Sequence, residues 1–166
     1  QRFYTLKKGD VEFLVLDSNY MSPEQLAWLQ KQLKDSNAKW KIAYFHHPLF
    51  SDGKFHGSDL DLRARLLPIF QSAGLNLVLS GHDHLYERLK PQDGIYFFVL
   101  GSSGQLRPHD LRRAPDIASG DDTDRTFMLM EIAGDNLYFQ TINNKGATVD
   151  SGSYARQNFG GQNTAK

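Results

Sequence analysis

The sequence predicts an α/β protein in which parallel strands with helices are followed by antiparallel strands. Up to residue 80, apolar β-prone runs alternate with segments of helical periodicity, and this order favours a parallel sheet with right-handed crossovers. Beyond residue 85, short strand-like runs are separated by turn signals, which is typical of antiparallel pairing. The chain has 166 residues, 40% of them hydrophobic and 23% charged, so it can build the core of one globular domain.

Capping signals and regularly spaced leucines define two helices in the first part. Ser22-Pro23-Glu24-Gln25 supplies an N-cap, a proline at the first helical position and a capping-box glutamine. Leu26, Leu29 and Leu33 then repeat at helical spacing, and Gly74 ends the second helix. The elements expected in this part are strands at residues 11–16, 40–45 and 75–80 and helices at residues 22–37 and 60–72.

Three turn signals that combine Gly with Asp or Asn divide the second part into strands. Residues 101–125 form a polar stretch without periodicity, and a loop of that length in a compact domain is usually functional or mobile. The strands expected in this part are residues 86–89, 95–100, 126–132, 137–142 and 147–150.

Composition excludes several classes of function. Nineteen Lys and Arg balance nineteen Asp and Glu, so we expect neither nucleic acid nor an anionic membrane as a partner. The absence of cysteine excludes disulfides, thiolate metal sites and cysteine nucleophiles, so any metal must be bound through N and O. No apolar run approaches the roughly 20 residues that span a bilayer. We expect residues 1–151 to form part of one domain and residues 152–166 a flexible tail.

Histidine placement is the most informative feature of the sequence. Five of the six histidines, His46, His47, His56, His82 and His84, lie in two loops that each follow an expected parallel strand. Open α/β sheets assemble their sites at these strand ends, so the two loops can converge. Imidazole is a common ligand of zinc, iron and manganese, and His82-Asp83-His84 can point both rings toward neighbouring positions while Asp83 points elsewhere.

Each of these motifs also has a structural interpretation. A single His-x-His is often solvated, and His46-His47-Pro48 is compatible with an ordinary strand-terminating turn. His109 lies among charged residues in the long loop, where we expect it to be solvated. The acidic run at residues 121–124 lacks the glycine and distal glutamate of a calcium-binding loop, so a charged surface loop is favoured.

Five segments follow one another along the chain in a characteristic order: Leu16-Asp17-Ser18, the helical segment 28–33, Phe45-His46-His47-Pro48-Leu49-Phe50, His56-Gly57, and residues 81–88, which read Gly-His-Asp-His-Leu-Tyr-Glu-Arg. Together they resemble the calcineurin-like metallophosphoesterases, and among them the purple acid phosphatases, including the tartrate-resistant type. The resemblance covers residues 11–151. It implies the C-terminal half of a metallophosphoesterase α/β sandwich.

The resemblance also implies roles for individual residues. His46 and His82 would bind one metal ion and His84 the other, the two ions being drawn from Fe, Zn and Mn. His56 would contact the substrate phosphate or protonate the leaving group, and is the expected catalytic and substrate-binding residue. His47 falls at a position where the family accepts other residues, so it is not an expected ligand.

The remaining family ligands come from an earlier half, in the motifs Asp-x-[His or Gly], Gly-Asp-x-x-Asp and Gly-Asn-His. None of these motifs lies ahead of the histidine loops, and Asp17 matches a family position that is not a ligand. Three imidazoles cannot complete two ions and supply no bridging carboxylate. We therefore expect this chain alone to be incomplete and inactive, with the N-terminal half of the same domain as its partner.

The expected function is that of a metal-dependent phosphoric ester hydrolase, an acid phosphatase-like phosphomonoesterase with a dinuclear metal site acting on a phosphate ester. Two alternatives remain open at this point. One is a phosphodiesterase with the same site, acting on nucleotides or lipids, and the other is a non-catalytic metal-binding or interaction domain. The likeness to acid phosphatases is the one feature that points to a secreted or periplasmic location.

Overall fold

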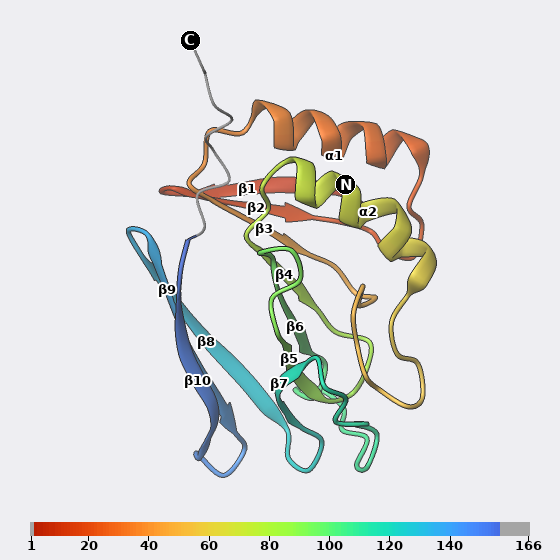
Figure 1. Cartoon of the computed structure of the whole chain (residues 1–166), viewed down its shortest axis with the longest axis vertical. Helices are drawn as coiled ribbons and strands as arrows, with labels where there is room; N and C mark the ends of the chain where they lie inside the picture. Colours follow the sequence, from red (N-terminus) through yellow and green to blue (C-terminus); the bar gives the residue numbers. More distant parts are fainter. Residues whose placement is uncertain (1, 157–166) are drawn as a thin grey trace.

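The computed structural model describes residues 2–156, in which two helices and two sheets form three layers (Figure 1). Within this part, the larger sheet has the strand order β1-β2-β3-β4-β6-β5-β7 and the smaller sheet the order β10-β9-β8. The elements are β1 (Tyr4–Lys8), β2 (Val11–Val15), α1 (Pro23–Asp35), β3 (Trp40–Tyr44), α2 (Leu60–Ser72), β4 (Leu77–Ser80), β5 (Tyr86–Leu89), β6 (Tyr96–Leu100), β7 (Ile117–Asp121), β8 (Thr126–Ala133), β9 (Asn136–Asn143) and β10 (Thr148–Ala155). The expected α/β class and its mixture of parallel and antiparallel strands are confirmed.

Both helices begin at capped positions. The Ser22 hydroxyl accepts a hydrogen bond from the Gln25 amide at 3.1 Å, which confirms the cap expected for α1. Asp59 caps α2 in the same way by accepting the Leu62 amide at 2.9 Å. In the described part of the chain, neither helix is long and apolar enough to cross a membrane.

The pairing of β6 corrects one expectation. β2, β3 and β4 are parallel as predicted, but β6 is also parallel to β4 and lies between β4 and β5. Four of its five residues are buried, as is typical of a parallel strand covered on both faces. The expectation of an entirely antiparallel second half is therefore wrong for the pairing of β6 with β4, which is parallel. It is correct for the pairs that β5 makes with β6 and with β7.

The structure contains two strands that were not expected, and a third strand is longer than expected. β1 and β7 are edge strands whose residues are mostly exposed or half-buried, so neither carries the apolar pattern that predicts a strand. β10 runs to Ala155 and pairs with β9, which corrects the expected flexible tail for residues 152–155. The rest of that expected tail, residues 157–166, lies outside the described residues.

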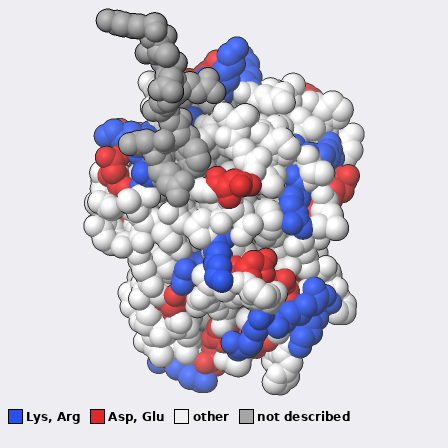
Figure 2. Space-filling view, in the orientation of Figure 1, with Lys and Arg blue, Asp and Glu red and all other residues white. Residues whose placement is uncertain are grey.

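The larger sheet is covered on both faces. Leu14 and Val78 pack with the helices on one face, whereas Ile42 and Leu77 pack against the smaller sheet on the other. This two-sided burial explains the nearly continuous apolar runs of the parallel strands. Basic and acidic side chains are interspersed on the face of the molecule shown in Figure 2.

A polar network joins the two sheets through one carboxylate. The Arg88 guanidinium donates to both oxygens of Asp150, at 2.6 and 3.0 Å, and the Tyr86 hydroxyl donates to the same carboxylate at 2.7 Å. Burial acts to raise the pKa of Asp150, but the bonds from Arg88 and Tyr86 outweigh it and leave this pKa lowered. β5 and β10, which lie far apart in the sequence, are thereby held together.

Replacing Arg88 with alanine is expected to lower the free energy of unfolding by about 2 to 3 kcal/mol, because it leaves a mostly buried carboxylate without its charged partner. Urea unfolding of the protein measures this change. Lys31→Ala breaks an exposed ion pair with Asp35 and is the matched control, with an expected effect below about 0.5 kcal/mol. Equal effects of the two substitutions would contradict the interpretation.

Candidate metal centre

The carboxyl ends of β3 and β4 bring the two expected histidine loops together. The Phe45 amide donates to the Leu79 carbonyl at 3.2 Å, and the Gly81 amide donates to the His46 carbonyl at 3.0 Å. These bonds continue the pairing of the two strands past their ends. The first residues of the two loops are consequently held side by side, as their position after parallel strands predicts.

Three imidazole rings converge at this edge. The Nδ1 atom of His82 lies 3.0 Å from the Nε2 atom of His46. One ring nitrogen from each of His46, His47 and His82 lies within 4.8 Å of the other two. The geometry therefore unites two of the expected ligands, His46 and His82, and adds His47, which sequence reasoning had left out.

His56 reaches the same cluster from the loop between β3 and α2. Its ring centroid lies 4.1 Å from that of His82, and its side chain is exposed. An exposed ring packed against a candidate ligand can contact a molecule that arrives from solvent.

His84 does not belong to the group of three converging ring nitrogens. Its Nδ1 atom is buried and has no hydrogen-bond partner among residues 2–156. His84 is nevertheless close enough to act electrostatically on both His46 and His82. The two histidines of the His-x-His motif therefore occupy neighbouring but different positions, while Asp83 between them is buried and points elsewhere, as the alternation predicts.

The environment of the cluster keeps its central rings neutral. Burial, joined by the charges of the neighbouring histidines His56, His47, His46 and His84, lowers the pKa of His82 to about 4. Burial and the charges of its histidine neighbours also lower the pKa of His46. Neutral imidazole is the form that binds metal ions, so both rings are ready to act as ligands at neutral pH.

The donor set fits a metal ion. Two nitrogen ligands at about 2.0 to 2.1 Å from one ion lie about 3 Å apart, which agrees with the His46–His82 distance of 3.0 Å. The cluster found within the described residues contains no carboxylate. Asp17 is engaged locally, because its carboxylate accepts the Asn19 amide at 3.0 Å. These residues therefore fit part of a metal centre and leave oxygen ligands to be supplied from elsewhere.

Ser18 orients the His46–His47 turn and was not recognised from the sequence. Its hydroxyl accepts the amides of His46 and His47 at 3.2 and 3.1 Å, and it lies 3.0 Å from His47 Nδ1. The signal that could have identified it is its position just after β2, a parallel neighbour of β3.

The long polar stretch is folded onto the loop that carries His56. A β-bridge joins Gly53 to Leu111, and the Leu111 amide donates to the buried carboxylate of Asp122 at 2.9 Å. His109 is exposed, as expected. The stretch is thus structural support for the His56 loop.

The sequence Gly-Asp-Asp-Thr-Asp at residues 120–124 matches the Gly-Asp-x-x-Asp pattern, but it follows the histidine loops instead of preceding them. Its carboxylates are engaged elsewhere: Asp121 accepts Thr123, Asp122 accepts Leu111, and Asp124 pairs with Lys145. Asp122 is 5% exposed, which corrects the expectation of a surface loop for that residue.

Glu87 is a buried acid beneath the His56 loop. Both of its carboxylate oxygens accept the Asp52 amide, at 3.2 and 3.1 Å. The pKa of Glu87 is raised to about 8, chiefly by burial. The charges of Asp52 and Asp83 act in the same direction, whereas the bonds from the Asp52 amide and the Ser51 hydroxyl oppose the rise. The folded protein therefore holds a proton on this group at neutral pH.

The Glu87 carboxyl is expected to make stability depend on pH. The pKa of this carboxyl rises from the usual 4.5 to about 8 on folding, so the folded state binds its proton more tightly than the unfolded state. The stability that this proton contributes is fully present below pH 4.5 and is lost as the pH rises toward 8. The loss is at most about 1.4 kcal/mol per pH unit for one group. Glu87→Gln, which stays neutral, should flatten the fall in unfolding free energy that the wild-type protein shows between pH 5 and 8. Parallel curves for the two proteins would refute this.

The first part of the chain matches a known protein family. Residues 2–86 match the family model of the calcineurin-like phosphoesterases. The chain belongs to the calcineurin-like phosphoesterase family.

Purple acid phosphatases are among its relatives. Purple acid phosphatase 17 of Arabidopsis thaliana is 37% identical over 76 residues, which cover 46% of this chain and 22% of that protein. The chain spans about a fifth of the length of the curated relatives it matches.

Solved structures share the fold over nearly the whole chain. A purple acid phosphatase from yellow lupin (Lupinus luteus) seeds superposes with a TM-score of 0.84 at 19% identity, covering 94% of this chain and 33% of that one. GAP50, described as the anchor in the inner membrane complex of Plasmodium, superposes with a TM-score of 0.79 at 20% identity, covering 93% of this chain and 53% of that one. At these identities the likeness establishes the fold alone.

Proposed function

We propose that the complete protein is a metal-dependent phosphoric monoester hydrolase of the acid phosphatase type, in which this chain supplies the histidine side of a two-ion centre. The observation that carries the proposal is the 3.0 Å approach of His46 Nε2 and His82 Nδ1 at the ends of two parallel strands. Relatives named as purple acid phosphatases support the substrate class.

Each histidine has a distinct part in this proposal. His46 and His82 hold one ion, and His84, which does not belong to the group of converging ring nitrogens, holds the other. Bound metal ions of this kind polarise phosphoryl oxygens and lower the pKa of water. His56 is exposed beside His82, where its imidazole can donate a hydrogen bond to a phosphoryl oxygen or a proton to the leaving oxygen.

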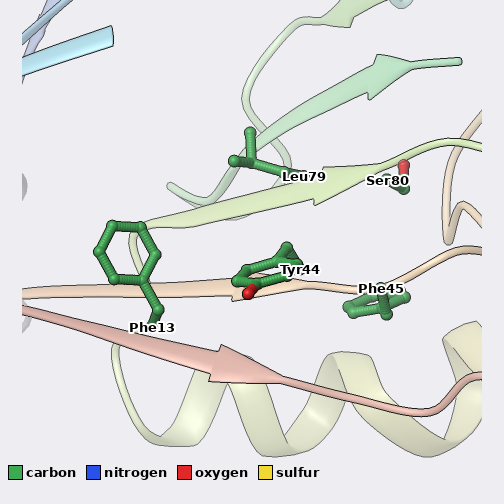
Figure 3. A pocket seen from close by; sticks show the side chains of 5 residues that line it. All are labelled: Phe13, Tyr44, Phe45, Leu79 and Ser80. Atoms are coloured by element: carbon green, nitrogen blue, oxygen red, sulfur yellow. The ribbon is translucent and has the colours of Figure 1, made fainter. Parts of the chain in front are cut away.

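The oxygen ligands would come from the N-terminal half of the same domain. An open apolar groove of about 510 Å³ lies between the two sheets, with Phe13 and Leu79 on one side and Met128 and Met130 on the other. Figure 3 shows its continuation on β2, β3 and β4, where Phe13, Tyr44 and Leu79 lie side by side. A groove of this kind is suited to burial by further protein of the same domain.

A phosphodiesterase and a non-catalytic domain remain the alternatives. A diesterase would use the same histidines and differ in the residues that surround them. The likeness of the fold to a protein described as an anchor shows that the fold by itself does not decide between hydrolysis and binding. The histidine cluster favours hydrolysis, because an anchor does not need converging neutral imidazoles.

The proposal is tested by hydrolysis of p-nitrophenyl phosphate and bis(p-nitrophenyl) phosphate by the complete protein, before and after chelation and metal replacement. We expect the monoester to be the better substrate and chelation to abolish its turnover reversibly. His109→Ala, which changes an exposed histidine outside the cluster, is the matched control and should leave activity unchanged. A preference for the diester would favour the diesterase, and no turnover with metal bound would favour the non-catalytic alternative.

A further inference from the structure

Asp83 lies between two proposed metal ligands but points away from them into the protein. Its side chain is fully buried. Its Oδ2 atom accepts the Ser51 hydroxyl at 2.5 Å and the Gly57 amide at 3.2 Å. One carboxylate oxygen therefore holds both ends of the loop 51–57, which carries His56.

The loop is also fitted closely around this carboxylate. A Cβ atom added to Gly53 would lie 2.6 Å from Asp83 Cγ, so the loop backbone can approach the carboxylate only because residue 53 is glycine. The Gly53 amide also donates to the Ser51 hydroxyl at 3.1 Å. Loop and carboxylate thus form one packed unit.

This arrangement has an energetic cost. Asp83 Oδ1 is buried and has no hydrogen-bond partner among the described residues. A buried polar atom without a partner destabilises the folded state, and an apolar side chain could fill this position without that cost. The carboxylate is therefore better explained by the two bonds it makes to the loop than by stability alone.

We propose that Asp83 is a positioning residue that fixes His56 against His82 and so aligns it for its part in the reaction. This inference rests on the proposed function of His56. Asp83 lies between His82 and His84 in the same turn, so its bonds fix the position of the loop relative to the proposed metal ligands. His56 directly precedes Gly57, one of the two loop residues that Asp83 holds, which transmits its position to the ring.

The test compares Asp83→Asn and Ser51→Ala in the complete protein. Hydrogen–deuterium exchange of residues 51–57 should become about tenfold faster in both variants, because each breaks the clamp from one side. Metal content should stay at the wild-type value, and kcat should fall by about ten- to a hundredfold, the usual cost of a small misplacement of a catalytic group. Asp150→Asn removes the charge from another buried carboxylate, which bonds to Tyr86 and Arg88 and not to residues 51–57, and should leave loop exchange unchanged.

A double-mutant cycle with His56→Ala separates positioning from a general loss of stability. If Asp83 acts through His56, Asp83→Asn should cost little further activity once His56 is absent. Additive losses, unchanged exchange in residues 51–57, or wild-type kcat with a loosened loop would each overturn the proposal. Absence of phosphatase activity in the wild-type protein would instead overturn the proposed function. The exchange measurement distinguishes this outcome from failure of the positioning proposal, because exchange does not depend on turnover.

Discussion

Replacing His46 with alanine in the complete protein is expected to empty one metal position and to reduce hydrolysis on the order of a thousandfold. Loss of a residue that merely supports a metal ligand typically costs about 10- to 100-fold, so loss of a direct ligand should cost more. The 3.0 Å spacing of His46 Nε2 and His82 Nδ1 implies that His82→Ala depletes the same position. Metal analysis of the folded variants, expressed as ions per protein, measures this directly.

His84→Ala should deplete the other position while the ion held by His46 and His82 remains. The reason is that His84 does not belong to the group of converging ring nitrogens. Circular dichroism shows whether each variant is folded, and His109→Ala again serves as the control. Loss of both ions to the same extent in the His46 and His84 variants would count against this division of ligands.

Replacing His56 with alanine should keep the full metal content and reduce hydrolysis by about 10² to 10⁴. The loss is expected to be smaller for an ester with an acidic phenol as leaving group than for an alkyl ester. A good leaving group departs with little help from an acid, so removal of the acid affects it least. Steady-state rates on p-nitrophenyl phosphate and a simple alkyl phosphate provide the comparison.

Two results would change the assignment of His56. A variant that loses metal would make His56 a ligand. Unchanged rates on both esters would show that His56 is an ordinary solvated residue of an exposed loop. His109→Ala is the matched exposed histidine and should leave both rates unchanged.

The sequence predicted the part of the fold that positions the candidate site. β2, β3 and β4 are recognisable because one face is buried and the other is at least half-buried, which produces short apolar runs ending at the histidine loops. β1 and β7 were missed because edge strands need no such pattern. The order of β5 and β6 depends on how the chain crosses the sheet, and local sequence carries little information about that choice.

The candidate site could be predicted only in part for a similar reason. Strand ends placed His46 and His82 together, because parallel neighbours share an edge. His47 joins the cluster because Ser18 holds the amides of both His46 and His47, a contact between residues far apart in the chain. The connection of Asp83 to Ser51 and Gly57 likewise appears only when the loops are packed together.

Anomalous X-ray diffraction from crystals of the complete, active protein, recorded at the absorption edges of its metals, would locate the ions directly. We expect one ion bonded to His46 Nε2 and His82 Nδ1, a second bonded to His84, and no bond to His56. Active protein without an ion at the ends of β3 and β4, or with an ion bonded to His56, would contradict this expectation.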